Sequence, residues 1–457
     1  MDLQGILARH EGKTLEFKRD LSSPGPIIKT IVAFANTAGG ELVIGVDDET
    51  RDVVGLADLL REEERLANLI ADRIEPAVLP DLEIVAWRSA NVLVARIADS
   101  PLRPYFVKSE GAENGVYVRV GSTSRRAGPE LIRELSRYAQ GRSFDEEPYP
   151  EMNSEEIDFR AASESFGPIR RLKRADLQTL RILTSYQGSI VPTVGGLLLF
   201  GQRRLEFFPD AWIRVGLFGG RDRTRILDSK EITSHLPLAA EEAIAQIARM
   251  TATSLEIGGA RHTARPTYPA AAVREAVINA VVHADYAERG TPISVSLFSD
   301  RIEVENPGLL PFGLTMGDIQ EGSSKLRNRV IGRVFKELGL IEQWGSGIQR
   351  MTGACREAGL ADPMFEERAA GFRVTIHAAL AGPPLLDPMD SAVLQILRAR
   401  YKAGGAATSE VAHSIGRSDR STRTRLVRLA DRGLVVRLGS SRNDPKARWV
   451  PAGPLAR

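Results

Sequence analysis

The chain has 457 residues, more than one hydrophobic core normally accommodates, so two to four domains are expected. An apolar fraction of 43% and a charged fraction of 26% exclude a disordered chain, and a net charge of +2 assigns no partner class. Cys355 is the only cysteine, which excludes an intrachain disulfide and fits a reducing compartment. The N-terminus lacks a signal-peptide pattern, and residues 195–200, the most apolar run, are too short to cross a bilayer. We therefore expect a cytoplasmic protein without a membrane partner.

Residues 1–140 alternate between helical and strand patterns. The segment 24–38 predicts a helix, and 39–48 predicts a buried strand that ends in Asp47 and Asp48. Later strands are predicted at 91–98 and 115–122. Glu11 and Glu16 are five residues apart and would face opposite sides of a single strand. They converge only if the chain turns between them, as Gly12 allows.

These segments, together with YVRVGSTSRRA at 117–127, resemble the Schlafen AlbA-type domain over about residues 8–140. In nuclease members of that group, three carboxylates bind a divalent ion and cut RNA or DNA. The resemblance transfers these roles to Glu11, Glu16 and Asp47, with Asp48 as the alternative third acid. Oxygen ligands suit Mg²⁺ or Mn²⁺. The other interpretation is a binding domain with solvated acids, and in both the phosphate contacts would come from Lys18, Arg119, Arg125 and Arg126.

Two segments are predicted to be linkers. Residues 141–156 are acidic, contain prolines and have few apolar side chains, and residues 378–388 carry paired prolines. The predicted organisation is therefore an N-terminal domain at 1–140, a linker at 141–156, a middle domain at 157–380, and a C-terminal domain at 388–457.

The middle domain contains the segment REAVINAVVHADY at 274–286, which predicts an apolar helix. Glu275 and Asn279 lie four residues apart and so project from one face of that helix. The pair either faces water or faces a ligand. Further along, Asn306 and Gly308 end a predicted strand, and the turn Gly345-Ser346-Gly347 precedes a helix. Such a turn lets backbone N–H groups approach phosphate oxygens.

Four segments in this order resemble the ATPase domain of the GHKL superfamily (gyrase B, MutL and histidine kinases), especially its RecG-like C-terminal variant, over about residues 165–380. They are VGGLLLFG, YPAAAVREAVINAVVHADY, ENPGLLP and RNRVIGRVFKELGLIEQWGSGI. The resemblance implies that Glu275 activates water and that Asn279 binds Mg²⁺. It implies further ATP contacts at Asn306, Gly308, Gly345 and Gly347, under a lid that carries Lys325, Arg327 and Asn328.

Two positions depart from the GHKL pattern. Asn306 stands where an aspartate usually accepts a hydrogen bond from the adenine amino group, and Leu310 replaces a glycine. An asparagine oxygen still accepts, but without the assistance of a charge. We therefore expect ATP binding and leave hydrolysis, as a weak ATPase, open.

The C-terminal domain is predicted to contain three helices and a hairpin, at 389–401, 408–416, 418–433 and 434–451, with Thr408 capping the second helix. This pattern resembles the winged helix-turn-helix family. Residues 388–457 contain 14 Lys and Arg against 5 Asp and Glu. DNA contacts are expected from Arg417, Arg420, Arg423 and Arg425, around the front of the third helix. The alternative is a winged helix used for dimerisation.

The sequence thus predicts an α+β multidomain protein: a Schlafen AlbA-type domain, a GHKL-like α/β sandwich and a winged helix-turn-helix. The favoured function is an ATP-responsive, DNA-binding transcription regulator. The alternative is an ATP-gated, metal-dependent nuclease that cuts tRNA, other RNA or single-stranded DNA, as in defence against phage. A homo-oligomer is expected by analogy with GHKL-like domains.

Overall fold

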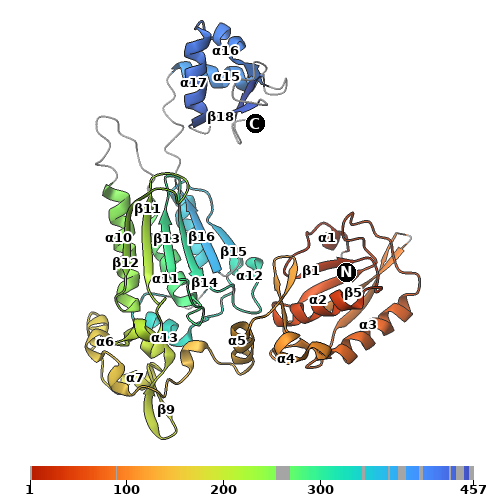
Figure 1. The fold of residues 1–457 in the computed structure, drawn as a ribbon, viewed down its shortest axis with the longest axis vertical. Coiled ribbons are helices and arrows are strands. Elements are labelled where there is room, and N and C mark those ends of the chain that lie inside the picture. Colours follow the sequence, from red (N-terminus) through yellow and green to blue (C-terminus); the bar gives the residue numbers. More distant parts are fainter. Residues whose placement is uncertain are drawn as a thin grey trace. The chain divides into compact units, whose positions relative to one another are not determined.

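The computed structural model describes residues 3–88, 90–253, 268–341, 345–368, 371–378, 388–400, 405–431, 434–438 and 447–451. The chain forms two compact units, residues 1–379 and 380–457, which are described separately (Figure 1). Within the described part of the chain, no helix has both the length and the apolar character that a membrane span requires.

The N-terminal part of the first unit is built on a sheet with the strand order β1-β2-β5-β4. Its strands are β1 (Leu15–Lys18), β2 (Gly40–Ile44), β4 (Asp81–Trp87) and β5 (Ala90–Ile97). Strands β1 and β2 run parallel, and the other neighbours are antiparallel. The helices of this sheet layer are α1 (Leu3–Leu7), α2 (Pro24–Asn36) and α3 (Leu59–Arg73). Apolar residues of α2 and α3 pack against β2 and β5 in one core.

The predicted helix at 24–38 and the strands at 39–48 and 91–98 are confirmed as α2, β2 and β5. The predicted end of the strand at 39–48 was wrong. Strand β2 ends at Ile44, because Gly45 adopts a φ of 104° and turns the chain, and Val46 then forms an isolated bridge with Val53. Asp47 therefore lies in the turn that follows the strand.

Smaller elements complete this part. They are β3 (Ile74–Glu75), β6 (Phe106–Val107), η1 (Lys108–Glu110), α4 (Gly111–Asn114), β7 (Tyr117–Val120), β8 (Thr123–Arg126) and α5 (Pro129–Ala139). Buried Asn36 joins them to the end of α2. Its amide donates to the carbonyls of Tyr105 and Tyr117 at 2.8 and 2.9 Å and accepts from Tyr105 N at 2.7 Å. A buried amide with three partners ties these segments together.

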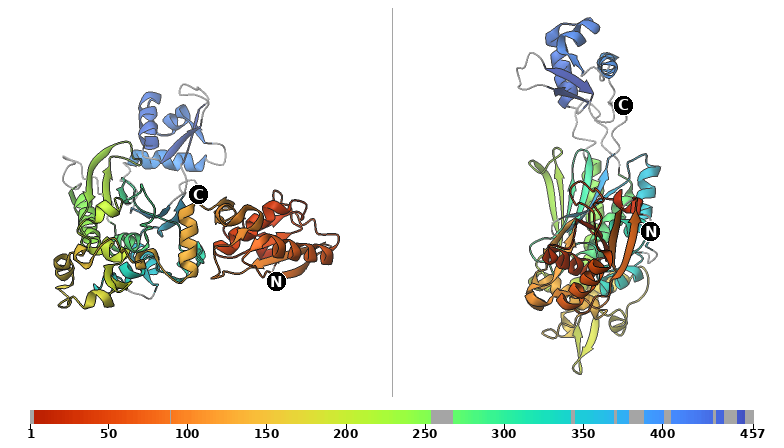
Figure 2. Two further views of the ribbon diagram at one scale, coloured as in Figure 1. Left: turned by 60° about the horizontal axis from the view of Figure 1, so that its bottom comes forward. Right: turned by 90° about the vertical axis from the view of Figure 1, so that its right-hand side faces the viewer.

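The remainder of the first unit is a sheet with the order β12-β11-β13-β14-β16-β15 and helices packed on one of its faces (Figures 1 and 2). The strands are β11 (Ile213–Phe218), β12 (Ile226–Ile232), β13 (Ile293–Leu297), β14 (Arg301–Pro307), β15 (Met364–Arg368) and β16 (Gly371–His377). The helices are α6 (Phe159–Phe166), α7 (Asp176–Thr179), α8 (Val194–Phe200), α9 (Arg204–Phe207), α10 (Leu236–Thr253), α11 (Ala270–His283), α12 (Met316–Gln320), α13 (Arg329–Glu337) and α14 (Gly347–Glu357). A hairpin of β9 (Leu183–Tyr186) and β10 (Ser189–Pro192) precedes α8.

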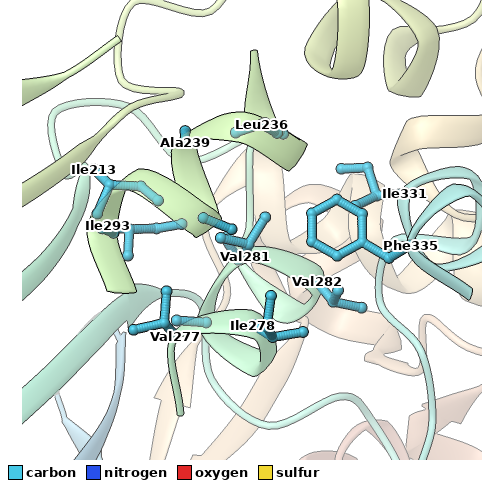
Figure 3. Close-up of a cluster of buried hydrophobic side chains, with 14 of the residues drawn as sticks. Ile213, Leu236, Ala239, Val277, Ile278, Val281, Val282, Ile293, Ile331 and Phe335 are labelled. Atoms are coloured by element: carbon cyan, nitrogen blue, oxygen red, sulfur yellow. The ribbon is translucent and has the colours of Figure 1, made fainter. Parts of the chain in front are cut away.

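Helix α11 lies at the centre of this core. Figure 3 shows Val277, Ile278, Val281 and Val282 of α11 among side chains of neighbouring strands and helices. Those neighbours include Ile213, Leu236, Ala239, Ile293, Ile331 and Phe335, from β11, α10, β13 and α13. Because apolar residues surround most of the helix, little of its circumference remains for polar side chains.

The segment 141–156, predicted from its composition to be a linker, is instead packed against α8 and α13. It forms η2 (Phe144–Glu146) and η3 (Ser154–Glu156), and Pro148 pairs with Thr193. Buried Asp145 accepts hydrogen bonds from the backbone N–H groups of residues 329, 330 and 331 at 2.9, 2.7 and 2.9 Å. These groups begin α13 and have no acceptor within the helix. The low apolar content led to the wrong prediction because a buried carboxylate, and not an apolar cluster, attaches the segment to α13.

The second unit contains the predicted helices and hairpin. They are α15 (Pro388–Ala399), β17 (Ala406–Ala407), α16 (Thr408–Ser414), α17 (Asp419–Asp431), β18 (Val435–Leu438) and β19 (Arg448–Pro451), with the strand order β17-β19-β18. The cap of α16 was predicted wrongly. The N-cap residue is Ala407, and Thr408 is the first helical residue, whose hydroxyl accepts from the indole N–H of Trp449 at 3.1 Å. The hairpin loop and most of the predicted linker at 378–388 lie outside the described residues.

Replacing Asp145 with alanine should lower the free energy of unfolding by about 3 kcal/mol. A lost helix cap costs about 1 kcal/mol, and buried N–H groups left without an acceptor cost about 1–3 kcal/mol. Asp158→Ala is the matched control, because Asp158 caps α6 through the N–H of Ala161 but is only half-buried. Thermal melting compares the two variants, and equal losses in Tm would contradict the special role of Asp145.

Candidate nucleotide and nucleic-acid sites

A cavity of about 1260 Å³ opens beside α11, and residues from α5, β14, α13, α14 and the segment between β14 and α13 line it. Its wall contains eight of the nine residues predicted for the nucleotide site: Glu275, Asn279, Asn306, Lys325, Arg327, Asn328, Gly345 and Gly347. Gly308 is outside the wall and directly precedes the lining residue Leu309. The fold therefore brings together residues that are up to 72 positions apart in the sequence.

Glu275 and Asn279 face this cavity together. The amide Nδ2 of Asn279 donates to Glu275 Oε1 at 3.2 Å, and Arg350 of α14 donates to the other carboxylate oxygen at 3.1 Å. A carboxylate only accepts, so Asn279 must present its nitrogen to Glu275. Its Oδ1 is then directed elsewhere, as an oxygen ligand for a cation requires.

The glycine turn before α14 is needed for close packing. A Cβ atom at Gly347 would lie 2.9 Å from Cδ of Glu275 and 3.4 Å from Nδ2 of Asn279. Gly345 has a φ of 68°, and a Cβ there would collide with the carbonyl of Gly322. The turn therefore brings the N-terminus of α14 against the polar pair of α11, where its N–H groups favour an anion.

Asn306 is buried on β14, on the cavity side of the sheet. Its Nδ2 donates to the carbonyl of Pro307 at 3.0 Å, which leaves Oδ1 as the acceptor. Gly308 follows with a φ of 92°, and a Cβ there would lie 2.7 Å from the Cβ of Asp285. The strand end is thus built to leave one amide oxygen available to a hydrogen-bond donor in the cavity.

The cationic residues of the predicted lid are already paired. Lys325 lies 3.5 Å from Asp99 and donates to the hydroxyl of Tyr138 at 3.1 Å. Arg327 forms ion pairs with Glu134 and with Asp285. Asn328 is buried and donates to the carbonyls of residues 282 and 284 at 2.9 and 2.7 Å, which joins the lid to the end of α11.

His283 also lines the cavity, near the charge of Arg327. Burial, and after it the charge of Arg327, lowers the pKa of His283 to about 4. The imidazole is therefore neutral at pH 7 and adds no positive charge to the site.

Sequence reasoning missed several residues of the cavity wall. Phe365 and Phe372 line it from β15 and β16, and strand alternation could have placed Phe372 on the same face as Val374. Glu134 and Tyr138 of α5 also line it, although α5 precedes the whole predicted ATPase domain. Nothing in the sequence indicates that contact.

The predicted turn between Glu11 and Glu16 is confirmed. The N–H of Gly12 donates to the carbonyl of Leu15 at 3.1 Å, and Glu11 accepts from the N–H of Phe17 at 2.8 Å. Glu11 is thereby held against the strand that carries Glu16.

Each of the three predicted acids already has protein partners. Glu16 is buried, and its two oxygens pair with Arg119 at 2.7 Å and Lys18 at 2.8 Å. Asp47 accepts from the N–H groups of residues 49 and 50 at 3.1 and 2.9 Å, and the hydrogen bond from residue 50 is the largest cause that lowers its pKa. Among the described residues, no group of three His, Cys, Asp or Glu side chains is arranged to hold a metal ion.

The predicted nucleic-acid cations differ in exposure. In the first unit, Arg119 is buried and donates to Glu16 and to the carbonyl of Gly12, whereas Arg125 and Arg126 of β8 are exposed and Lys18 is half-buried. In the second unit, Arg425 pairs with buried Asp390. The exposed cations at the front of α17 are Arg417, Arg420 and Arg423.

Comparison with protein families matches two parts of the chain. Residues 11–128 match the family described as "Schlafen, AlbA_2", and residues 290–376 match the family described as "Putative ATP-dependent DNA helicase recG C-terminal". The chain combines a Schlafen AlbA-type domain with a RecG-like ATPase domain. The second match begins after α11, so it includes Asn306 and the lid but neither Glu275 nor Asn279. The two matches indicate a nucleic-acid-associated, ATPase-like protein.

Two solved structures are similar in sequence over different lengths. The DIP2311 protein from Corynebacterium diphtheriae is 17% identical over 98% of both chains, with a TM-score of 0.42. The N-terminal domain of a RecG-related protein from Nitrosomonas europaea is 28% identical over 27% of this chain and 90% of its own, with a TM-score of 0.22. Both TM-scores are too low to support an argument about the fold. No curated protein matches the chain.

Asn306 should provide part of the preference for adenine. Asn306→Ala should weaken ATP binding by about two- to tenfold, since one hydrogen bond contributes about 0.5–1.5 kcal/mol. Inosine triphosphate, which carries a carbonyl in place of the amino group, should bind the wild-type protein more weakly than ATP. Calorimetry with both nucleotides measures the difference, which should shrink in Asn306→Ala. An unchanged ratio of the two affinities would remove Asn306 from base recognition.

Proposed function

We propose that this protein is an ATP-responsive transcription regulator that binds DNA. The observation that carries the proposal is the Glu275–Asn279 pair, which faces a large cavity at the N-terminus of α14. Both side chains are partly buried, and polar side chains that converge on a cavity are typical of a ligand site. The match to a RecG-like ATPase family over residues 290–376 supports a nucleotide as that ligand.

The donor set fits ATP with Mg²⁺. Asn279 would hold the ion through Oδ1, the N–H groups that follow Gly345 would bind phosphate, and Asn306 would accept from the adenine amino group. The ion, when bound, neutralises phosphate charge. Glu275 is placed to orient water, although Arg350 occupies one of its carboxylate oxygens, so this ion pair would have to open for Glu275 to use both oxygens.

The nucleic-acid contacts of the proposal come from exposed arginines. Arg417, Arg420 and Arg423 lie at the front of α17, in a unit whose three helices and hairpin fit a winged helix. Arg125 and Arg126 provide a second group on β8.

Binding is favoured over cleavage by the contacts of the acids. Both oxygens of Glu16 are used by Arg119 and Lys18, so a metal ion would have to displace two cations from a buried carboxylate. Breaking such buried pairs is costly. The alternative function, a metal-dependent Schlafen-type nuclease, therefore ranks second.

Changing the two polar residues of α11 should separate metal-dependent binding from hydrolysis. Asn279→Ala should remove the Mg²⁺-dependent part of ATP affinity, because it deletes the oxygen ligand. Glu275→Ala should still bind ATP and should abolish any slow hydrolysis. Calorimetry with and without Mg²⁺ and a phosphate-release assay measure both effects.

Asn153→Ala serves as the control, since Asn153 is exposed and only caps η3. If the wild-type protein gives no binding heat with ATP, ADP or GTP, the nucleotide part of the proposal is wrong.

Deleting residues 388–457 should remove most of the affinity for duplex DNA. The deleted residues fall within the second compact unit, so residues 1–379 should remain folded. Each lost phosphate contact should reduce the slope of log K against log salt by about 0.9. In the full chain, replacing Arg417, Arg420 and Arg423 with glutamine should lower the slope by about 2–3. Glutamine at the exposed Arg160, Arg203 and Arg214 is the charge-matched control.

If DNA binding is unchanged after the deletion, we would assign DNA binding to the N-terminal domain instead. Incubation with tRNA or single-stranded DNA and Mg²⁺ or Mn²⁺ addresses the nuclease alternative. Cleavage that Glu16→Gln abolishes would overturn the regulator proposal. Sedimentation with and without ATP tests the expected homo-oligomer.

A further inference from the structure

The segment between β14 and α13, residues 308–328, is called the lid segment below. It contacts the N-terminal domain at several points. The N–H of Gly313 donates to the carbonyl of Thr37 at 2.7 Å, and Lys325 approaches Asp99 at 3.5 Å. Arg103 joins these contacts: it pairs with Asp99, donates to the carbonyl of Thr37 at 2.9 Å, and lies over the ring of Phe312 at 5.5 Å.

The two cations of the lid segment differ in how firmly they are held. The side chains of Lys325 and Asp99 are each 37% exposed, so water screens their attraction. Arg327 is 9% exposed, and its partners Glu134 and Asp285 are 19% and 13% exposed. Exposed ion pairs contribute little to stability, whereas separating a buried pair leaves a buried charge without a partner, which is destabilising. Lys325 is therefore the cation that can change partners.

We propose that ATP is sensed through Lys325, which exchanges Asp99 for the phosphates of the nucleotide and so loosens the contact between the lid segment and Thr37. This inference rests on the proposed nucleotide binding and adds its regulation. Lys325 lines the same cavity as Glu275 and Asn279, so a triphosphate bound there competes directly for its ammonium group. A triphosphate carries several negative charges and Asp99 only one, so the Coulomb attraction of the Lys325 ammonium for the phosphates is the greater.

Asp99 can release Lys325 without becoming a stranded charge. It keeps the buried guanidinium of Arg103, which also holds the carbonyls of Ala35 and Thr37. The hydroxyl of Tyr138 is the other side-chain partner that Lys325 gives up. The exchange therefore leaves the N-terminal domain intact and changes only how the lid segment contacts it.

Thr37 connects this contact to the acids of the N-terminal domain. Its carbonyl accepts from Gly313 of the lid segment, and its hydroxyl accepts from the N–H of Arg119 at 2.9 Å. Arg119 in turn pairs with Glu16 at 2.7 Å. A lid segment that moves away from Thr37 thus acts on the residue that positions the Glu16 carboxylate. By linkage, any factor by which ATP changes nucleic-acid affinity is the factor by which nucleic acid changes ATP affinity.

The first experiment measures ATP affinity of the full chain by calorimetry. Asp99→Asn should raise the affinity about two- to fivefold, the factor that corresponds to an exposed ion pair. Tyr138→Phe keeps the ring and removes only the hydroxyl, and it should raise the affinity in the same direction. Lys325→Gln should lower the affinity. Asp81→Asn, which loses an exposed pair with Arg96 away from the lid segment, should change nothing.

The second experiment follows hydrogen exchange of the Gly313 amide. ATP should speed its exchange in the wild-type protein and in Asp81→Asn, and should have no effect in Lys325→Gln. AMP, which lacks the outer phosphates, should leave the exchange unchanged. If Asp99→Asn does not fold, Tyr138→Phe alone tests the expected rise in ATP affinity in the first experiment.

The outcomes separate the two proposals. If the wild-type protein does not bind ATP, the proposed function is wrong and the exchange of Lys325 falls with it. If ATP binds but Gly313 exchange is unaltered, or if Asp99→Asn and Tyr138→Phe bind ATP like the wild type, the sensing role of Lys325 is overturned. The nucleotide site itself would stand in that case.

Discussion

The burial of α11 is the constraint on which the rest of the ATPase domain depends. Apolar side chains occupy most of its circumference and pack against β11, β13, α10 and α13. Glu275 and Asn279 can then face only the remaining side, where the cavity and the N-terminus of α14 lie. Two polar side chains on an otherwise buried helix are costly unless they have hydrogen-bond partners. Here Asn279 and Glu275 bond to each other.

Charged side chains connect the segments of the first unit that precede the ATPase domain to the ATPase domain itself. Asp145, before the ATPase domain, caps α13, and Glu134 of α5 pairs with Arg327 of the lid segment. Segments that precede the ATPase domain in sequence thus complete its cavity. The proposed exchange of Lys325 would therefore alter contacts in both domains.

In the N-terminal domain, a sequence motif that is typical of metal-dependent nucleases is used for structural contacts. Glu11 and Glu16 have the spacing of a carboxylate site, yet their oxygens bind the backbone of Phe17 and the side chains of Arg119 and Lys18. These contacts stabilise the turn at Gly12 and fix β7 against β1. The same residues are therefore explained by structure alone, and a nuclease role would need a rearrangement of these ion pairs.

The sequence by itself determined most helices and strands, because their hydrophobic period and turn glycines are local properties. It also predicted that Glu275 and Asn279 share one face of a helix, since residues four apart on a helix have a fixed geometry. The roles of Asn306 and of the turn at Gly345 were implied by the resemblance to GHKL ATPases. Only the tertiary structure decided which charges meet. Three contacts join residues that are far apart in sequence. They are the packing of segment 141–156 through Asp145, the pairing of Arg119 with Glu16, and the contact of Lys325 with Asp99. Electrostatic partners depend on distance in space, which no local pattern records.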